Sequence, residues 1–241
     1  MKIIKISDNN EAGKIVSDLI LNEVKSNSKI VLGLATGSSP ITTYENIIVK
    51  SKELNIDWSK VTTFNLDEYK GLSSQHSQSY RYFMNNKLFD HINIDQKNTF
   101  VPSGMIETNN EAQKYDELIS QKGGIDLQLL GLGINGHVGF NEPGSDFEGL
   151  TSIVKLTKST IEANSRFFEN ENDVPTQAIS MGLKSIMNAK KIILIATGSA
   201  KAEAVKNLVE GPISKDWPCS ILLNHKDVTV VIDNEAARLL K

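Results

Sequence analysis

Two segments of this chain share one local pattern, in which a run of Val, Ile and Leu leads directly into the tetrapeptide ATGS. The first run begins at Lys29 and ends in ATGS at residues 35–38, and the second begins at Lys190 and ends in ATGS at residues 196–199. A continuous apolar run that stops at a Gly/Ser turn is typical of a strand buried on both faces of a sheet. Each segment therefore predicts a buried strand followed by a tight turn.

Strand and helix patterns alternate over the rest of the chain as well. Helical spacing of apolar residues predicts helices over residues 10–26, 43–54, 79–89, 111–122 and 201–209 and from Asp233 to the end. Apolar runs predict strands over residues 29–35, 61–66, 125–133, 190–195, 220–224 and 228–232. This alternation favours an α/β fold with an open, mostly parallel, Rossmann-like sheet and helices on both faces.

The length of 241 residues suffices for one large domain or two small ones. No linker rich in Pro, Gly or Ser and no low-complexity tract divides the chain, so we expect a single domain over residues 1–241. The least regular segment, residues 155–177, is polar and contains Pro175 near its end. Its composition predicts a mobile lid.

Charge and composition exclude several classes of protein. The chain has 26 Lys and Arg against 29 Asp and Glu, a net charge of −3, and no basic block, which argues against a nucleic-acid or anionic-membrane partner. Its single cysteine, Cys219, cannot form an internal disulfide, and no Cys/His cluster has the spacing of a zinc site. No apolar run is long enough for a membrane span or a signal region. We therefore expect a soluble cytoplasmic protein.

The first ATGS turn is a candidate anion site. In an open α/β sheet, ligands bind at the carboxyl ends of the strands, where a Gly/Ser turn leaves backbone N–H groups unpaired. These donors and the dipole of the following helix favour phosphate, and Thr36, Ser38 and Ser39 add hydroxyl donors. The alternative is that Gly37 and Gly198 only permit tight turns. Neither segment has the GxxxxGK[ST] or GxGxxG pattern.

A second candidate is FNLDEY, residues 64–69, where two carboxylates follow a predicted strand. Asp67 and Glu68 then lie near the ligand crevice, and a carboxylate there can take a proton from carbon. The alternative for this acidic pair is helix capping or simple solvation.

The segment LLGLGINGHVGFNEPGS, residues 129–145, carries the strongest chemical signal. It places Asn135, His137 and Glu142 in one Gly-rich loop after a buried strand. An imidazole held by a carboxylate or an amide transfers protons near neutral pH. The alternative is a surface loop whose histidine is hydrogen-bonded to the backbone.

The segments GLATGSSPITTY, FNLDEY, GLGINGHVGFNEPGS, EANSRFF and TGSAKAEAV, in this order, resemble the glucosamine-6-phosphate deaminase family over nearly the whole chain. The 6-phosphogluconolactonases and ribose-5-phosphate isomerases share the fold of this family. A lactonase is expected to carry something like GHTASLFP where this chain has GHVGFNE. The resemblance implies a hydrolase of amino-sugar catabolism that converts α-D-glucosamine 6-phosphate and water to D-fructose 6-phosphate and ammonium. It implies no metal and no organic cofactor.

The resemblance also implies roles for individual residues. His137, oriented by Asn135 and Glu142, opens the sugar ring, and Asp67 moves the hydrogen from C2 to C1. The residues implied to bind the substrate phosphate are Thr36, Gly37, Ser38, Ser39, Arg166 and Lys201.

Arg166 and Lys201, the two cations of this set, each have an alternative interpretation without a role in binding. Arg166 is implied to couple phosphate binding to closure of the lid. Its alternative is a solvated charge, and that of Lys201 is an exposed residue in the first turn of a helix.

Two other functions remain open on the sequence: a 6-phosphogluconolactonase-like hydrolase, and a sugar-phosphate sensor that has lost catalysis. The presence of Asp67 and His137 favours an enzyme. Hexameric allosteric members of the family bind N-acetylglucosamine 6-phosphate through an Arg-x-Lys pair after FNEP, where this chain has Ser152 and Val154, with Lys155 one position late. The comparison predicts no allosteric effector and a monomer or small homo-oligomer.

Overall fold

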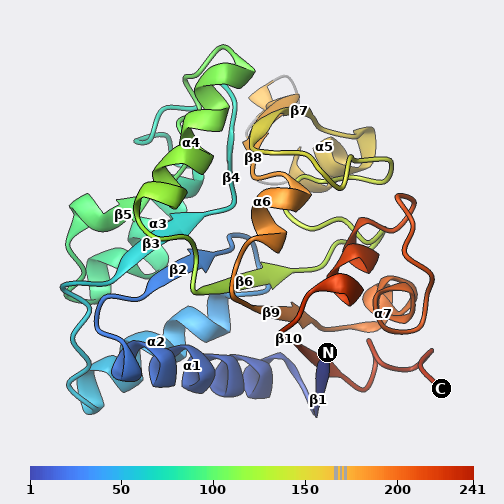
Figure 1. Ribbon diagram of the computed structural model, residues 1–241, viewed down its shortest axis with the longest axis horizontal. Helices are drawn as coiled ribbons and strands as arrows, with labels where there is room; N and C mark the ends of the chain where they lie inside the picture. The colour runs from blue at the N-terminus through green and yellow to red at the C-terminus, as the bar shows by residue number, and fades with distance from the viewer. Residues whose placement is uncertain (166–167, 169, 171–172) are drawn as a thin grey trace.

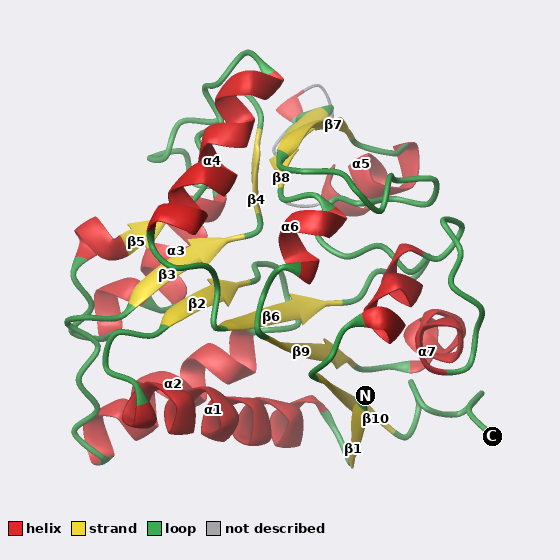
Figure 2. Cartoon of the chain, in the orientation of Figure 1, coloured by secondary structure: helices red, strands yellow, loops and turns green. Residues whose placement is uncertain are grey.

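A parallel sheet forms the centre of the molecule in this computed structural model, which describes residues 1–165, 168, 170 and 173–241. Its strands are β1 (Lys2–Ile6), β2 (Val31–Leu34), β3 (Thr62–Asn65), β5 (Thr99–Phe100), β6 (Leu127–Gly131), β9 (Lys191–Ala196) and β10 (Val228–Asp233). The order within the described residues is β1-β10-β9-β6-β2-β3-β5, and each neighbouring pair is parallel (Figures 1 and 2). The predicted α/β fold is confirmed.

Helices cover both faces of this sheet (Figure 1). One face packs against α1 (Asn9–Ser26), α2 (Ile41–Glu53) and α3 (Tyr80–Lys87). The opposite face packs against α4 (Asn109–Gln121), α6 (Leu183–Met187), α7 (Ala202–Val209) and the 3-10 helix η5 (Pro218–Asn224). Shorter 3-10 helices are η1 (Phe89–His91), η2 (Gln96–Asn98) and η4 (Ser199–Lys201). No helix of the described chain is both long and apolar enough to span a bilayer.

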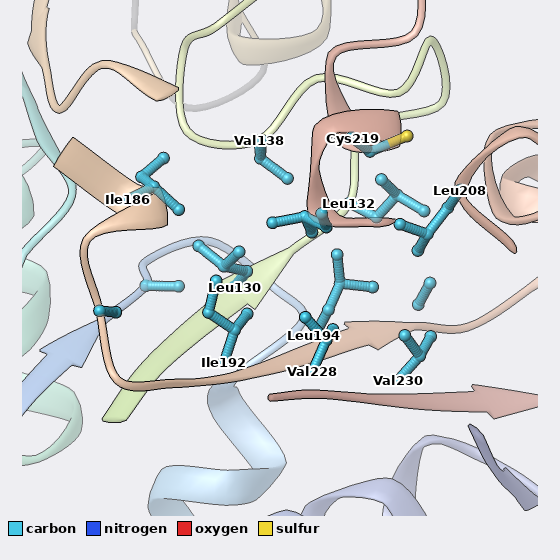
Figure 3. Close-up of a cluster of buried hydrophobic side chains, with 14 of the residues drawn as sticks. Leu130, Leu132, Val138, Ile186, Ile192, Leu194, Leu208, Cys219, Val228 and Val230 are labelled. Carbon is cyan, nitrogen blue, oxygen red and sulfur yellow. The ribbon is translucent and has the colours of Figure 1, made fainter. Parts of the chain in front are cut away.

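Alternation along the central strands explains why their sequences are apolar at nearly every position. In β9, Ile193 and Ile195 join the core beneath α1 and α2, whereas Ile192 and Leu194 join the core on the other face. Successive side chains of a strand point to opposite faces, so a sheet covered on both sides buries both sets. Figure 3 shows the second core, where Ile192 and Leu194 lie with Leu208 of α7.

A small antiparallel sheet lies beside the central one and was not predicted. Its strands are β4 (Asp67–Tyr69), β7 (Ser152–Lys155) and β8 (Gln177–Ser180), in the order β4-β8-β7. The helix α5 (Lys158–Ser165) follows β7. The segment predicted to be least regular, residues 155–177, thus contains a helix in its described part. Arg166 lies outside the described residues.

Several predictions at the level of single elements need correction, and the strand β5 and the helix α6 were also not predicted. Residues 220–224 form part of η5 rather than a strand, because a short apolar run does not distinguish a strand from a buried helical turn. The predicted helix from Asp233 is a series of turns. The backbone N–H groups of Arg238 and Leu240 bond to the oxygens of Glu235 and Ala237, three residues back, which forms turns rather than an α-helical ladder. The edge strand β1 was not predicted at all.

The strand order reverses between β2 and β6. From β2 the chain proceeds to β3 and β5 at one edge, and it then returns as β6 on the other side of β2. The connections that leave two such strands diverge, so a crevice opens outside their carboxyl ends. The first ATGS turn follows β2, and the Gly-rich histidine loop follows β6.

Candidate active site

A cavity of about 340 Å³ lies at this reversal of strand order. Its walls come from the turn after β2, the start of β4, the loop after β6, the helix α5 and the residue before α7. These segments are far apart in the sequence and include most of the residues predicted for the site.

The turn after β2 has the properties of an anion site. Thr36, Gly37, Ser38 and Ser39 all line the cavity. Within the part of the chain that the structure describes, neither their backbone N–H groups nor their hydroxyls donate to a protein acceptor. The following helix, α2, begins without a side-chain cap. Unpaired donors at the positive end of a helix dipole attract an anion such as phosphate.

The second ATGS turn differs, although its sequence is the same. The backbone N–H of Gly198 donates to both carboxylate oxygens of Asp233, at 3.1 and 2.9 Å, so this donor is satisfied within the protein. The turn instead brings Lys201 to the cavity. Burial lowers the pKa of Lys201, and no carboxylate of the described residues lies within ion-pair distance of it. A half-buried, unpaired ammonium group suits an anionic ligand.

The two adjacent carboxylates of FNLDEY have different surroundings. Asp67 lines the cavity, whereas Glu68 accepts hydrogen bonds from the backbone N–H groups of Tyr80 at 2.9 Å and Arg81 at 3.1 Å. Both residues belong to β4, whose successive side chains point to opposite faces. The helix-capping alternative therefore describes Glu68, at the start of α3, and leaves Asp67 for the cavity.

Burial controls the proton affinity of Asp67. The residue is 7% exposed, and burial, followed by the neighbouring charge of Glu68, raises its pKa to about 8. Gly139 faces it, and a Cβ atom there would lie 3.6 Å from Oδ2 of Asp67. The absent side chain leaves room for a ligand beside the carboxylate. A group with this proton affinity can both take and return a proton near neutral pH.

The loop after β6 brings its three polar side chains together. Oδ1 of Asn135 lies 2.7 Å from Nδ1 of His137, and Nδ2 of Asn135 donates to Oε2 of Glu142 at 2.7 Å. Because a carboxylate only accepts hydrogen bonds, Asn135 must turn its nitrogen to Glu142 and its oxygen to His137. The proton of the imidazole is then on Nδ1, and Nε2 is the nitrogen that can accept a proton.

Close packing of the loop backbone holds the imidazole in place. A Cβ atom at Gly133 would lie 2.3 Å from two atoms of the His137 ring. Any larger residue would therefore displace the ring, so the glycine is required by contact with the histidine.

Glu142 connects this loop with α5. Oγ1 of Thr160 donates to Oε1 of Glu142 at 2.6 Å, and Oγ1 of Thr157 does so at 3.3 Å. Burial opposes ionisation of Glu142, but its contacts with His137, Thr160 and Asn135 outweigh burial and lower its pKa to about 2. The carboxylate is therefore charged at neutral pH.

Sequence reasoning missed Thr160 and Tyr80, which also line the cavity. Tyr80 packs against Tyr69, with ring centroids 4.8 Å apart. No motif marked either residue, because both reach the cavity only through the packing of their helices. Among the described residues, no cluster of His, Cys, Asp and Glu is arranged to hold a metal ion.

Comparison with known proteins shows the family to which the chain is similar. Residues 9–231 match the family described as glucosamine-6-phosphate isomerases/6-phosphogluconolactonase. A glucosamine-6-phosphate deaminase of Mycoplasma mycoides subsp. mycoides is 52% identical over 240 residues, which cover 100% of this chain and 98% of the relative. A protein of the same name from Clostridium perfringens is 52% identical over 242 residues and is covered completely, as is this chain.

Solved structures show similarity at two levels. A monomeric glucosamine-6-phosphate deaminase is 42% identical, with a TM-score of 0.96, over 99% of this chain and 100% of that one. A 6-phosphogluconolactonase from Trypanosoma brucei is 19% identical, with a TM-score of 0.78, over 100% of this chain and 98% of that one. The second likeness concerns the fold alone.

The raised pKa of Asp67 predicts a pH-dependent cost to stability. The unfolded chain loses this proton near the ordinary pKa of 3.8, whereas the folded protein keeps it to about 8. Unfolding therefore releases a proton between these values, and the free energy of unfolding falls as pH rises. We expect Asp67→Asn to raise the Tm relative to wild type, and by more at pH 8 than at pH 5, in thermal unfolding experiments. Asp90→Asn, at an exposed position, is the control. If the Tm of Asp67→Asn differed from that of wild type by the same amount at both pH values, the raised pKa of Asp67 would be contradicted.

Proposed function

The chain belongs to the family of glucosamine-6-phosphate isomerases and 6-phosphogluconolactonases, and we propose that it converts α-D-glucosamine 6-phosphate and water to D-fructose 6-phosphate and ammonium. Deaminases of this activity are its relatives at 52% identity over full length, whereas the lactonase compared shares the fold at 19%. The observation that carries the proposal is the joint placement of Asp67, His137 and the free turn at residues 36–39 around one cavity. The enzyme thus belongs to amino-sugar catabolism.

Ring opening is assigned to His137. The substrate is a closed pyranose, and its C1–O5 bond breaks when a proton moves from the anomeric hydroxyl to the ring oxygen. Nε2 of His137 takes the first proton and returns it to O5, while C1 becomes an aldehyde. Asn135 and Glu142 keep Nδ1 protonated, so Nε2 is the atom available for this transfer.

Proton transfer between carbons is assigned to Asp67. Its carboxylate takes the proton from C2 of the open sugar and delivers it to C1, while one proton of the substrate ammonium group passes to O1. C1 thus becomes CH2OH, and C2 becomes an iminium carbon. Water adds to C2, both of its protons pass to the nitrogen, and the C2–N bond breaks to leave a C2 ketone and ammonium. The proposal includes no cofactor.

Phosphate binding is assigned to the turn at residues 36–39 together with Lys201. The unpaired N–H groups of the turn and the half-buried ammonium group of Lys201 support this assignment. Arg166 is proposed as a second cation, in a lid over residues 155–177 that closes on the substrate. The whole chain, residues 1–241, is proposed to serve as one sugar-phosphate domain in the cytoplasm.

The first experiment tests two points, the deaminase activity of the protein and the role of Asp67 as the base that takes the C2 proton. Wild type should release ammonia from glucosamine 6-phosphate and should not hydrolyse 6-phosphogluconolactone, both measured in coupled assays. Asp67→Asn should bind the sugar phosphate but lose turnover by on the order of 10²- to 10⁴-fold, because an amide cannot accept the C2 proton. Substantial activity of this variant would exclude Asp67 as the base. Binding without turnover by wild type would instead support the sensor function.

The two partners of the imidazole should contribute unequally. Glu142 carries a full charge and Asn135 only a dipole, and Oε2 of Glu142 lies 3.5 Å from Nδ1 of His137 even without the amide. We expect Glu142→Gln to lower kcat/KM roughly 10²-fold and Asn135→Ala to lower it less, in ammonia-release assays. Glu148→Gln, which alters an exposed carboxylate, is the control. The reverse order of damage would show that the amide is the main support.

Regulation is proposed to be absent. Ser152 and Val154 occupy the places of the effector-binding pair, and Val154 packs against a cluster of Tyr69 and Phe140 rather than facing an effector. Without a second ligand site there is no coupling free energy to produce cooperativity. We expect hyperbolic kinetics, no activation by N-acetylglucosamine 6-phosphate, and a monomer or small oligomer by light scattering. A sigmoidal rate curve that this sugar makes hyperbolic would contradict the prediction.

A further inference from the structure

The two oxygens of the Glu142 carboxylate serve different parts of the protein. Oε2 accepts from Asn135 at 2.7 Å and lies 3.5 Å from Nδ1 of His137, on the side of the histidine loop. Oε1 accepts from Oγ1 of Thr160 at 2.6 Å, on the side of α5. The orientation of the carboxylate is therefore determined from both sides, and one determinant lies outside the loop.

Tertiary packing, rather than local sequence, brings Thr160 to this position. The next residue of α5, Ile161, packs against the cluster that contains Tyr69 and Phe140, and this contact holds the helix beside the cavity. Oγ1 of Thr157 lies 2.9 Å from Oγ1 of Thr160, which adds a second contact at the start of the helix. Threonine is stiff at χ1, so a docked α5 presents the hydroxyl in a defined direction.

We propose that Thr160 is a positioning residue for ring opening, which orients Glu142 and, through Asn135, the imidazole of His137. The inference rests on the proposed function and extends it to a residue of α5. The terminal torsion of a glutamate is broad, and a short hydrogen bond to an ionised oxygen restricts it. Thr160 exchanges no proton with the substrate. Thr160 acts by fixing the position of the His137 imidazole, and the rate of ring opening depends strongly on that position.

This role affects one step of the reaction and leaves another intact. Opening of the pyranose requires the oriented imidazole. Transfer of the proton between C1 and C2 requires Asp67, which lies on β4 and shares no hydrogen bond with Thr160 among the described residues. D-Fructose 6-phosphate supplies an open-chain sugar to Asp67, because its five-membered ring opens readily in water. Exchange of its C1 proton with solvent therefore reports on Asp67 without the ring-opening step.

The experiment compares Thr160→Val, which removes the hydroxyl and keeps the shape, with Thr160→Ser, which keeps the hydroxyl. Ser165→Ala is the matched control, since it removes a hydroxyl of the same helix that donates to the backbone oxygen of Glu162 instead. Ammonia release from glucosamine 6-phosphate gives kcat and KM. Loss of the C1 proton signal of D-fructose 6-phosphate in D₂O with ammonium gives the exchange rate.

We expect Thr160→Val to lower kcat roughly tenfold, an effect typical of losing an orienting partner of a reactive group. KM and the C1 exchange rate should stay within about twofold of wild type, a split that reflects loss of transition-state positioning without loss of binding. Thr160→Ser should restore most of the rate, and Ser165→Ala should match wild type. An unchanged kcat in Thr160→Val would overturn the proposal. So would an equal loss of turnover and exchange, or a failure of serine to rescue.

A measurement without turnover separates this inference from the proposed function. In ¹⁵N-labelled protein, the Nδ1–H signal of His137 should be sharp in wild type and in Thr160→Ser, and broadened or shifted in Thr160→Val. A wild-type protein that releases no ammonia would refute the proposed function, while this signal would still decide whether Thr160 positions the imidazole. An identical signal in all variants would overturn the positioning role.

Discussion

The reversal of strand order between β2 and β6 is the constraint on which the site depends. Parallel strands end at one edge of a sheet, and only where neighbouring connections diverge does that edge open into a crevice. The turn at residues 36–39, which we propose to bind phosphate, follows one of these strands, and the histidine loop follows the other. Two helical layers bury the sheet on both faces, so the strand ends that carry the site have little freedom to move (Figure 1).

Local surroundings give the carboxylates of this site different pKa values. Asp67 and Glu68 are neighbours in sequence, yet Asp67 faces the cavity, whereas Glu68 accepts hydrogen bonds from backbone N–H groups at the start of α3. The pleat of β4 separates them, and burial of Asp67, followed by the charge of Glu68, raises its pKa to about 8. Glu142 shows the opposite outcome, because hydrogen bonds outweigh its burial and keep it ionised. The same functional group thus has a raised pKa in one residue and a lowered pKa in the other.

The small antiparallel sheet (β4-β8-β7) and α5 also contribute to the site. The strand β8 pairs with both β4, which carries Asp67, and β7, which leads into α5. One small sheet therefore connects Asp67 with the start of α5. Contacts of Thr160 and Ile161 then connect α5 to the histidine loop and to the aromatic cluster. In this arrangement, the segment proposed to close over the substrate also contacts Glu142, whose carboxylate lies beside Asn135 and His137.

The sequence by itself determined the parallel α/β sheet and most of the site, because buried strands and their Gly-rich turns leave a local pattern. Asp67, Asn135, His137 and Glu142 were identified from motifs and Lys201 from the family resemblance, and the structure brings them to one place. The sequence did not distinguish the two ATGS turns. Asp233, distant in the chain, satisfies an N–H group of the second turn, and no comparable acceptor from the described residues reaches the first.

Tertiary structure alone decided which residues without a motif reach the cavity. Thr160 and Tyr80 belong to helices whose position follows from packing against distant side chains, and packing has no periodic signature in a sequence. The edge strand β1, the 3-10 helix η5 and the turns after Asp233 were misjudged for a related reason. A short segment has too few residues for its period to be distinguished, so its neighbours in space determine its conformation.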